Sequence, residues 1–193
     1  MTNQNEKMIT YFKKLDRSFF MDSLKEFAHM DEAVPIGHEQ TISQPSLVLN
    51  MTLSLDLQPH SKVLELGTGS GYQTALLAAF SESVYTIERI KPLYEQAKER
   101  LKEIGFSNIH FKFDDGSMGW IEHAPYDRIM VTAATSEIPR ELLEQLALSG
   151  KMIIPVGTPV LQKLLLIEKD EYGKIYQEVL DHVRFVPLKG KYE

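Results

Sequence analysis

Short hydrophobic runs recur along the chain at nearly regular intervals, separated by segments of mixed polarity. The runs centre on Leu64, Tyr85, Phe111, Met130 and Ile153. Their length and their content of branched and aromatic side chains are typical of buried strands. Helical periodicity fills the segments between them. The pattern therefore predicts strands that alternate with helices, as in a parallel sheet covered on both faces.

The clearest helical segment spans residues 91–104. Pro92 suits its first turn, Gly105 suits its C-terminal cap, and its apolar face consists of Leu93, Ala97, Leu101 and Ile104. A second helix is predicted to begin at Tyr72. A third is predicted to begin near Pro139 and to carry Leu142, Leu143 and Leu146.

The pattern changes after Pro155. Residues 161–169 and residues 174–187 both read as strands, and residues 170–173 (Asp-Glu-Tyr-Gly) carry a turn signal. No helical pattern fits between the two strands. These observations predict an antiparallel hairpin appended to the parallel sheet.

The first 45 residues follow neither period clearly. Residues 8–15 and 18–27 are predicted to form short helices. Residues 34–45, which are rich in proline, glycine and polar side chains, are predicted to form a loop.

Length and composition fit an ordinary globular domain. A chain of 193 residues suits one domain with a full core. We therefore expect a single domain over residues 1–193, with residues 1–45 forming N-terminal helices and a substrate loop and residues 46–193 forming the core.

Charge and composition exclude several classes of partner. The net charge is −6, which argues against a general affinity for nucleic acid. The polar N-terminus carries no apolar signal region, and no apolar run is long enough to span a bilayer. The chain has no cysteine, and its six histidines lack metal-ligand spacing. We expect a cytoplasmic monomer with no metal, no nucleic-acid partner and no membrane partner.

A glycine-rich turn follows the first apolar strand. Residues 63–71 read VLELGTGSG, so that Gly67, Gly69 and Gly71 alternate just before the helix predicted at Tyr72. Such a turn exposes backbone N–H groups to a ligand. Glu88 closes the next apolar run, 21 residues after Gly67, where an acidic side chain would hold the hydroxyls of a ribose. The segment predicts a nucleoside-bearing cofactor, and the alternative is a tight turn that binds nothing.

The spacing of the glycines selects among nucleoside cofactors. A dinucleotide fold needs a glycine where this chain has Tyr72, and no Gly-Lys-Ser/Thr phosphate loop is present. The pattern instead resembles the first motif of S-adenosylmethionine-dependent methyltransferases. Glu65 would face the ammonium end of that cofactor and Glu88 its ribose. The expected cofactor-binding residues are Glu65, Gly67, Thr68, Gly69, Ser70, Gly71, Glu88, Asp115 and Gly116.

Two longer stretches and several short ones resemble one enzyme family. Residues 35–45 read PIGHEQTISQP and residues 63–78 read VLELGTGSGYQTALLA. Shorter matches follow in order along the chain: Thr86–Arg89, Asp115–Gly116, Val131–Ala134, Ile138–Pro139, Ile154–Gly157 and Arg184–Leu188. Together they resemble the protein-L-isoaspartate O-methyltransferases over residues 34–190.

The resemblance implies a fold and a reaction. The fold is the α/β, Rossmann-like fold of class I methyltransferases, with a seven-stranded, mostly parallel sheet, a reversed last strand and a short helical N-terminal extension. The reaction is methyl transfer from S-adenosylmethionine to the free carboxylate of isoaspartyl residues in damaged proteins and peptides. In the family this step starts a repair, because the methyl ester closes to a succinimide that hydrolyses partly to aspartate.

The resemblance also assigns residues to the acceptor side. It implies that Ser43 is the catalytic residue, whose hydroxyl would orient the acceptor carboxylate, and that Asp115 accepts from the adenine amino group. The acceptor-binding residues would be Gln40, Thr41, Ile42, Thr132 and Ala133. From the residues alone, the favoured interpretation of Ser43 is a helix cap before Pro45, and Asp115 is equally a strand-end turn residue.

The match has departures that bear on the acceptor. Glu39 and Asp114 stand where the family usually has glycine, and Asp16–Phe20 only faintly resembles the usual N-terminal motif. Two alternatives therefore stay open: a methyltransferase of the same scaffold with another acceptor, and a cofactor-binding protein without turnover.

Overall fold

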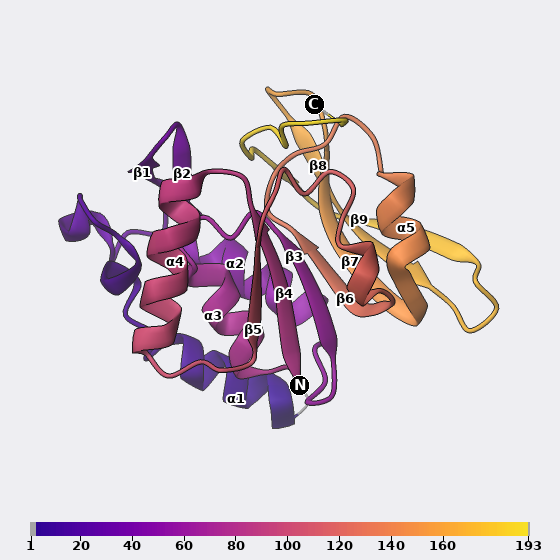
Figure 1. Ribbon diagram of the computed structural model, residues 1–193, viewed down its shortest axis with the longest axis horizontal. Coiled ribbons are helices and arrows are strands. Elements are labelled where there is room, and N and C mark those ends of the chain that lie inside the picture. The colour runs from indigo at the N-terminus through magenta and orange to yellow at the C-terminus, as the bar shows by residue number, and fades with distance from the viewer. Residues whose placement is uncertain (1–2, 193) are drawn as a thin grey trace.

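The five hydrophobic runs form neighbouring parallel strands of one sheet in the computed structural model, which describes residues 3–192 (Figure 1). Seven strands lie in the order β5-β4-β3-β6-β7-β8-β9. The five parallel strands are β3 (Lys62–Leu66), β4 (Ser83–Glu88), β5 (Ile109–Phe113), β6 (Tyr126–Val131) and β7 (Leu146–Gly157). The α/β class and the mostly parallel sheet are therefore confirmed.

The predicted C-terminal hairpin is also confirmed. It consists of β8 (Gln162–Lys169) and β9 (Ile175–Val183), and β8 runs antiparallel to both β7 and β9. Asp170 Oδ1 closes the turn by accepting from the N–H groups of Tyr172 (2.9 Å) and Lys174 (2.8 Å). The reversed strand is thus β8, so the expectation of a reversed last strand was wrong. The strand predicted to reach residue 187 ends at Val183.

Three helices lie close to their predicted positions. They are α3 (Tyr72–Ala79), α4 (Lys91–Glu103) and α5 (Arg140–Gln145). The prediction placed Leu146 on the last of these helices and was wrong there. Leu146 has extended backbone angles and pairs with Tyr126, because it already begins β7.

The N-terminal region differs most from the prediction. It contains α1 (Asn3–Phe12) and two single-turn 3₁₀ helices, η1 (Arg17–Phe20) and η2 (Lys25–Phe27), so the single helix predicted over residues 18–27 was wrong. The predicted loop contains a two-stranded hairpin of β1 (Val34–Gly37) and β2 (Gln40–Ile42). It then runs into α2 (Pro45–Ser54), which the pattern did not predict.

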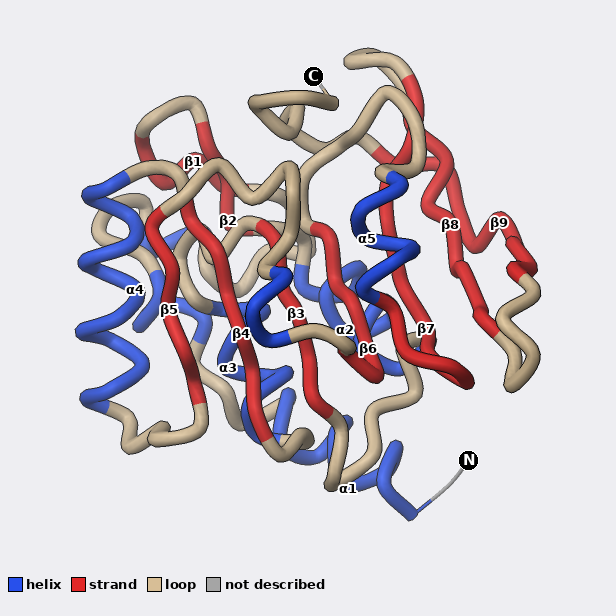
Figure 2. The backbone as a smooth tube through the Cα atoms, turned by 45° about the vertical axis from the view of Figure 1, so that its right-hand side comes forward, coloured by secondary structure: helices blue, strands red, loops and turns tan. Residues whose placement is uncertain are grey.

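Helices cover the two faces of the sheet unequally (Figure 2). Successive residues of β3 point to opposite faces, so Val63 belongs to one buried cluster and Leu64 to the other. Residues of α1, α2, α3 and α4 pack on the Val63 side, whereas α5 and the segment around the single-turn helix η3 (Ile121–His123) pack on the Leu64 side. No helix among residues 3–192 has the length and apolarity needed to cross a bilayer.

Candidate active site

A cavity of about 380 Å³ lies where the parallel strands end, and its lining includes the last two residues of β4 and residues that directly follow β3 and β6. The strand order reverses between β3 and β6, which is where open α/β sheets bind their ligands. The β1–β2 hairpin and the segment after β9 lie over the same edge of the sheet (Figure 2). The volume of the cavity lies within the range of ~300–1,000 Å³ that is usual for ligand pockets.

The glycine turn forms one wall of this cavity. Gly67 and Gly69 both line it, with φ values of +94° and +54° that favour glycine. A Cβ at Gly67 would collide with the Thr132 hydroxyl, whereas a Cβ at Gly69 would meet no atom of residues 3–192 within 4 Å. The turn therefore leaves open space beside Gly69. Thr68 and Ser70 also line the cavity, as predicted.

Gly71, the third glycine, does not line the cavity. It has a φ of +88° and precedes α3, and a Cβ there would lie 3.1 Å from Leu101 of α4. Gly116 is also outside the cavity, and its position faces Leu66 and Ile87. Both glycines allow close packing in the structure, and their predicted contact with the cofactor stays a prediction.

Glu88 closes the turn from β4. It is only 5% exposed and lines the cavity. Its Oε2 accepts from Gly69 N (2.8 Å) and its Oε1 from Ile90 N (2.8 Å). Each carboxylate oxygen keeps a further acceptor position, so Glu88 can accept ligand hydroxyls while it holds the turn.

Glu65 is predicted to face the ammonium end of the cofactor, and this stays a prediction, since the structure places its side chain away from the cavity wall. It is fully buried and absent from the cavity wall. Its Oε2 accepts from Thr74 (2.6 Å) and Thr86 (2.7 Å), while Oε1 has no partner among the described residues. Burial raises the pKa of Glu65 to about 8. The side chain alternates with Leu64 and Leu66 on β3, which turns it toward α3 rather than toward the end of the strand.

Glu65 is nonetheless connected to the glycine turn by hydrogen bonds. Thr86 Oγ1, which bonds to Glu65, also lies 2.6 Å from Thr68 Oγ1. Thr68 is a residue of the cavity wall. A buried chain of hydrogen bonds thus runs from Glu65 through Thr86 to the glycine turn.

Asp115 lines the cavity beyond the end of β5. Its Oδ1 accepts from both the N–H and the hydroxyl of Ser117, each at 2.7 Å. The turn interpretation of Asp115 is therefore correct. Its Oδ2 has no hydrogen bond in the described part of the chain, so the predicted role as an acceptor for a ligand amino group also stays open.

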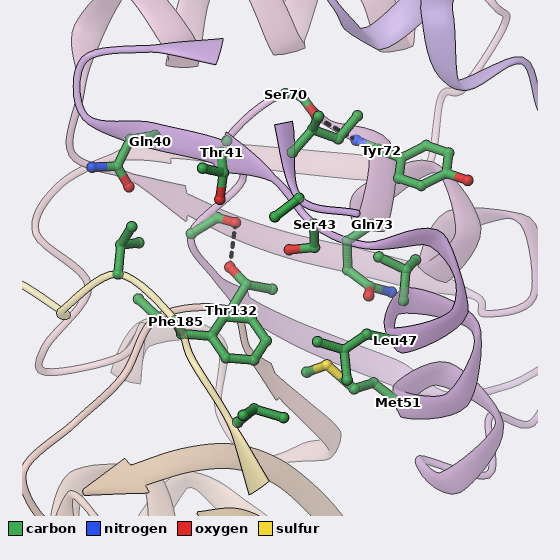
Figure 3. A pocket seen from close by; sticks show the side chains of 18 of the residues that line it. Gln40, Thr41, Ser43, Leu47, Met51, Ser70, Tyr72, Gln73, Thr132 and Phe185 are labelled. Atoms are coloured by element: carbon green, nitrogen blue, oxygen red, sulfur yellow. Dashed lines mark hydrogen bonds between the residues drawn. The ribbon is translucent and has the colours of Figure 1, made fainter. Parts of the chain in front are cut away.

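Ser43 also lines this cavity, and it lies between β2 and α2 (Figure 3). Its hydroxyl makes no hydrogen bond to any residue from 3 to 192. The capping interpretation was wrong, because the N-cap of α2 is Gln44 and the Asp31 carboxylate accepts from Ser46 N at 2.8 Å. The Ser43 hydroxyl is thus a donor left available to the cavity.

The other predicted acceptor residues line the same cavity. Gln40, Thr41 and Ile42 come from β2, and Ile42 is 2% exposed. Thr132 and Ala133 follow β6. The Thr132 hydroxyl lies 2.9 Å from Leu66 O and 2.7 Å from Gly67 O, so it holds the glycine turn and is not free for an acceptor.

Sequence reasoning missed the apolar wall of the cavity. Leu47 and Met51 of α2 and Phe185 beyond β9 point into the space near Ser43 and Thr132 (Figure 3). Phe185 belongs to the matched motif Arg184–Leu188, which could have indicated it. Leu47 and Met51 carry no comparable signal, because the sequence pattern did not predict α2.

Comparisons with known proteins agree with this geometry. The model of the family "Protein-L-isoaspartate(D-aspartate) O-methyltransferase" matches residues 1–193. A protein-L-isoaspartate O-methyltransferase of Dictyoglomus turgidum is 52% identical over 190 residues, which cover 98% of this chain and 86% of the relative. One of Pseudomonas aeruginosa is 49% identical over 186 residues, which cover 95% and 88%.

Solved structures show the same likeness. One, from Plasmodium falciparum, is described as a protein-L-isoaspartate O-methyltransferase in complex with S-adenosyl-L-homocysteine. Its TM-score is 0.81 at 28% identity, with 97% of this chain and 91% of that chain covered. A second protein-L-isoaspartate O-methyltransferase structure has a TM-score of 0.83 at 26% identity, with 97% of this chain and 67% of that chain covered.

Proposed function

Since the chain belongs to the protein-L-isoaspartate(D-aspartate) O-methyltransferase family, we propose that its cavity carries out that reaction, with Ser43 holding the acceptor. The chain is an S-adenosylmethionine-dependent protein carboxyl O-methyltransferase. Its acceptor is the free carboxylate of isoaspartyl residues in proteins and peptides. The observation that carries the assignment of the site is the Ser43 hydroxyl, which has no hydrogen-bond partner among residues 3–192 and faces the same cavity as the glycine turn and Glu88.

The residues of the cavity fit S-adenosylmethionine. The space beside Gly69 allows a ligand to approach the backbone, and Glu88 supplies acceptors for two ribose hydroxyls. Asp115 Oδ2 supplies an acceptor for the adenine amino group. When bound, the cofactor supplies an electrophilic methyl group on a sulfonium sulfur. We assign the cofactor to Gly67, Thr68, Gly69, Ser70, Glu88 and Asp115.

The acceptor needs orientation rather than activation. A carboxylate has a pKa near ~4 and is already ionised at neutral pH, so no general base is required. Ser43 donates a hydrogen bond to one carboxylate oxygen, which directs the other oxygen toward the methyl group at an approach of roughly 3 Å. Leu47, Met51 and Phe185 exclude water from this part of the cavity.

Methyl transfer to a matched peptide pair tests the proposal. Labelled S-adenosylmethionine is offered with a peptide that contains L-isoaspartate and with the same peptide containing aspartate. We expect base-labile label on the isoaspartyl peptide alone. Label on a small carboxylic acid but on neither peptide would give the chain another acceptor. Cofactor binding with no label on any acceptor would make it a binding protein without turnover.

We also propose how the whole chain acts. Residues 1–193 form one methyltransferase domain, with N-terminal helices and a substrate loop in residues 1–45 and the core in residues 46–193. It works as a cytoplasmic monomer on isoaspartyl-containing proteins, without a nucleic-acid or membrane partner. The net charge of −6 supports the absence of a nucleic-acid partner. Sedimentation of the purified chain at several concentrations tests the monomer, since an associating chain would sediment faster as concentration rises.

A further inference from the structure

Arg17 is buried against the segment that carries Ser43. It is the first residue of η1 and is only 4% exposed. Its guanidinium faces five backbone carbonyls. Nη1 donates to Ala28 O (3.3 Å) and Met30 O (3.1 Å), and Nη2 lies near the carbonyls of Glu32 (2.7 Å), Ile42 (3.3 Å) and Ser43 (3.1 Å).

These carbonyls belong to two segments that are distant in sequence. Residues 28–32 precede the β1–β2 hairpin, and residues 42–43 follow it. The guanidinium therefore joins both ends of the hairpin and fixes the peptide group of Ser43 directly. A planar fork of N–H donors suits this convergence of carbonyls, whereas an ammonium is a single point of charge.

Asp31 provides a second link between the same two segments. Its Oδ1 accepts from Ser46 N at 2.8 Å, and its Oδ2 accepts from Gln44 Nε2 at 3.0 Å. Ser43 thus lies between a link at its own carbonyl and a link one to three residues later. Both links leave the Ser43 hydroxyl unengaged.

Arg17 is itself anchored to the core. Asp16 caps η1 by accepting from Ser18 N at 2.9 Å. Phe20, at the end of η1, is 1% exposed, and its ring centroid lies 5.4 Å from that of Tyr72. Tyr72 begins α3 directly after the glycine turn. Contacts through η1 therefore connect the backbone of Ser43 to α3, the helix that follows the glycine turn.

We propose that Arg17 is a positioning residue for methyl transfer, which holds the peptide of Ser43 so that its hydroxyl meets the acceptor carboxylate. The inference rests on the proposed function of Ser43. It requires a rigid backbone at residues 42–43, because a displacement of about 1 Å of an orienting group can cost about 100-fold in rate. Cofactor affinity, in contrast, depends on the glycine turn and Glu88, which Arg17 does not contact.

The test compares two buried arginines that both bind backbone carbonyls. Arg17→Lys keeps the charge but removes the fork. Arg128→Lys is the matched control, since Arg128 is 8% exposed, is absent from the cavity wall, and donates to Asp56 O from Nε (3.0 Å) and Nη2 (2.9 Å). Asp31→Asn is the second variant, and its exposed position makes it the safer one for folding. All are measured well below their melting temperatures.

Three quantities are measured for each variant: kcat on the isoaspartyl peptide, the Kd for S-adenosylmethionine, and hydrogen exchange of the amides in residues 28–46. For Arg17→Lys we expect kcat to fall about 10- to 100-fold with Kd within about 2-fold, and faster exchange in residues 28–46. Asp31→Asn should show a smaller change of the same kind. Arg128→Lys should have a lower melting temperature than the unmodified chain and the same kcat.

Two results would overturn the proposal. One is a kcat for Arg17→Lys and Asp31→Asn as high as that of Arg128→Lys. The other is a Kd that rises in proportion to the loss of kcat, which would mean general damage to the cavity. If the unmodified chain methylates no isoaspartyl peptide, the proposed function fails instead. Hydrogen exchange then still decides whether Arg17 holds the Ser43 segment, and unchanged exchange in Arg17→Lys contradicts that role.

Discussion

Single residues of the cavity divide into groups that hold the backbone and groups left free for ligands. The Thr132 hydroxyl is engaged by the carbonyls of Leu66 and Gly67, whereas the Ser43 hydroxyl has no partner in the described chain. Sequence motifs indicated both residues equally. Only the fold tells their tasks apart, because a hydroxyl's hydrogen-bond partners depend on contacts that are distant in sequence.

Ser43→Ala tests the acceptor role. The loss of one hydrogen bond to a charged group is expected to lower kcat roughly 10- to 100-fold while the cofactor Kd stays within about 2-fold. Steady-state kinetics with the isoaspartyl peptide and titration with S-adenosylmethionine measure the two quantities. Ser54→Ala at the end of α2 is a matched control. Equal losses of kcat and affinity would show that Ser43 shapes the cofactor site instead.

Glu88→Ala tests the cofactor role. The substitution removes the acceptors for the ribose and also releases the N–H groups of Gly69 and Ile90. The cofactor Kd is expected to rise roughly 10- to 100-fold. Glu82→Ala, at an exposed position before the same strand, should leave the Kd unchanged. An unchanged Kd in Glu88→Ala would refute the ribose assignment.

Glu65 predicts a pH dependence of stability. Burial, opposed by the hydroxyls of Thr74 and Thr86, raises its pKa from an ordinary 4.5 to about 8. The folded state therefore holds a proton that the unfolded state releases, and stability falls as pH rises between these values, by up to ~1.4 kcal/mol per pH unit. Glu65→Gln should flatten the free energy of unfolding between pH 5 and pH 8, while Glu82→Gln should not. Parallel curves for the original chain and Glu65→Gln would contradict this account.

At the level of elements, the sequence predicted the strands and helices that repeat a clear period. The five parallel strands and α4 follow directly from apolar runs and caps. The sequence pattern predicts a loop where the β1–β2 hairpin lies, because the two strands have only four and three residues. Its turn also uses Gly37, His38 and Glu39 at positive φ, and two of these residues do not signal such a conformation. Without α2, the part of the apolar wall that Leu47 and Met51 form beside Ser43 could not be predicted.

Glu39 connects this turn to the question of the acceptor. It is exposed, has a φ of +59° and does not line the cavity, so its charge should have little effect on acceptor binding. Glu39→Gly should relieve left-handed strain of about 1 kcal/mol and raise the melting temperature by about 2–4 °C, with the KM for the isoaspartyl peptide unchanged. Glu39→Gln separates charge from backbone. A lower KM in both variants would show that Glu39 repels the acceptor.

For the whole molecule, sequence motifs and topology lead to the same edge of the sheet. The motifs between residues 35 and 188 are spread along the chain, yet most of their polar residues line one cavity, at the point where the strand order reverses between β3 and β6. The sequence predicted part of this arrangement, because the glycine turn and Glu88 were each expected to bind the cofactor where an apolar strand ends. The contacts that hold the segment of Ser43 were not predictable. Arg17 and Asp31 join segments that are distant in sequence, and no local sequence pattern indicates such contacts.

The most direct test of the central claim is the ratio of kcat/KM for the L-isoaspartyl peptide to that for its aspartyl counterpart. The two acceptors have the same composition and differ in where the backbone places the free carboxylate. A site in which Ser43 fixes that carboxylate should favour the isoaspartyl peptide by at least about 100-fold, since misplacement by about 1 Å costs that much. A ratio near one, with cofactor binding intact, would contradict the account.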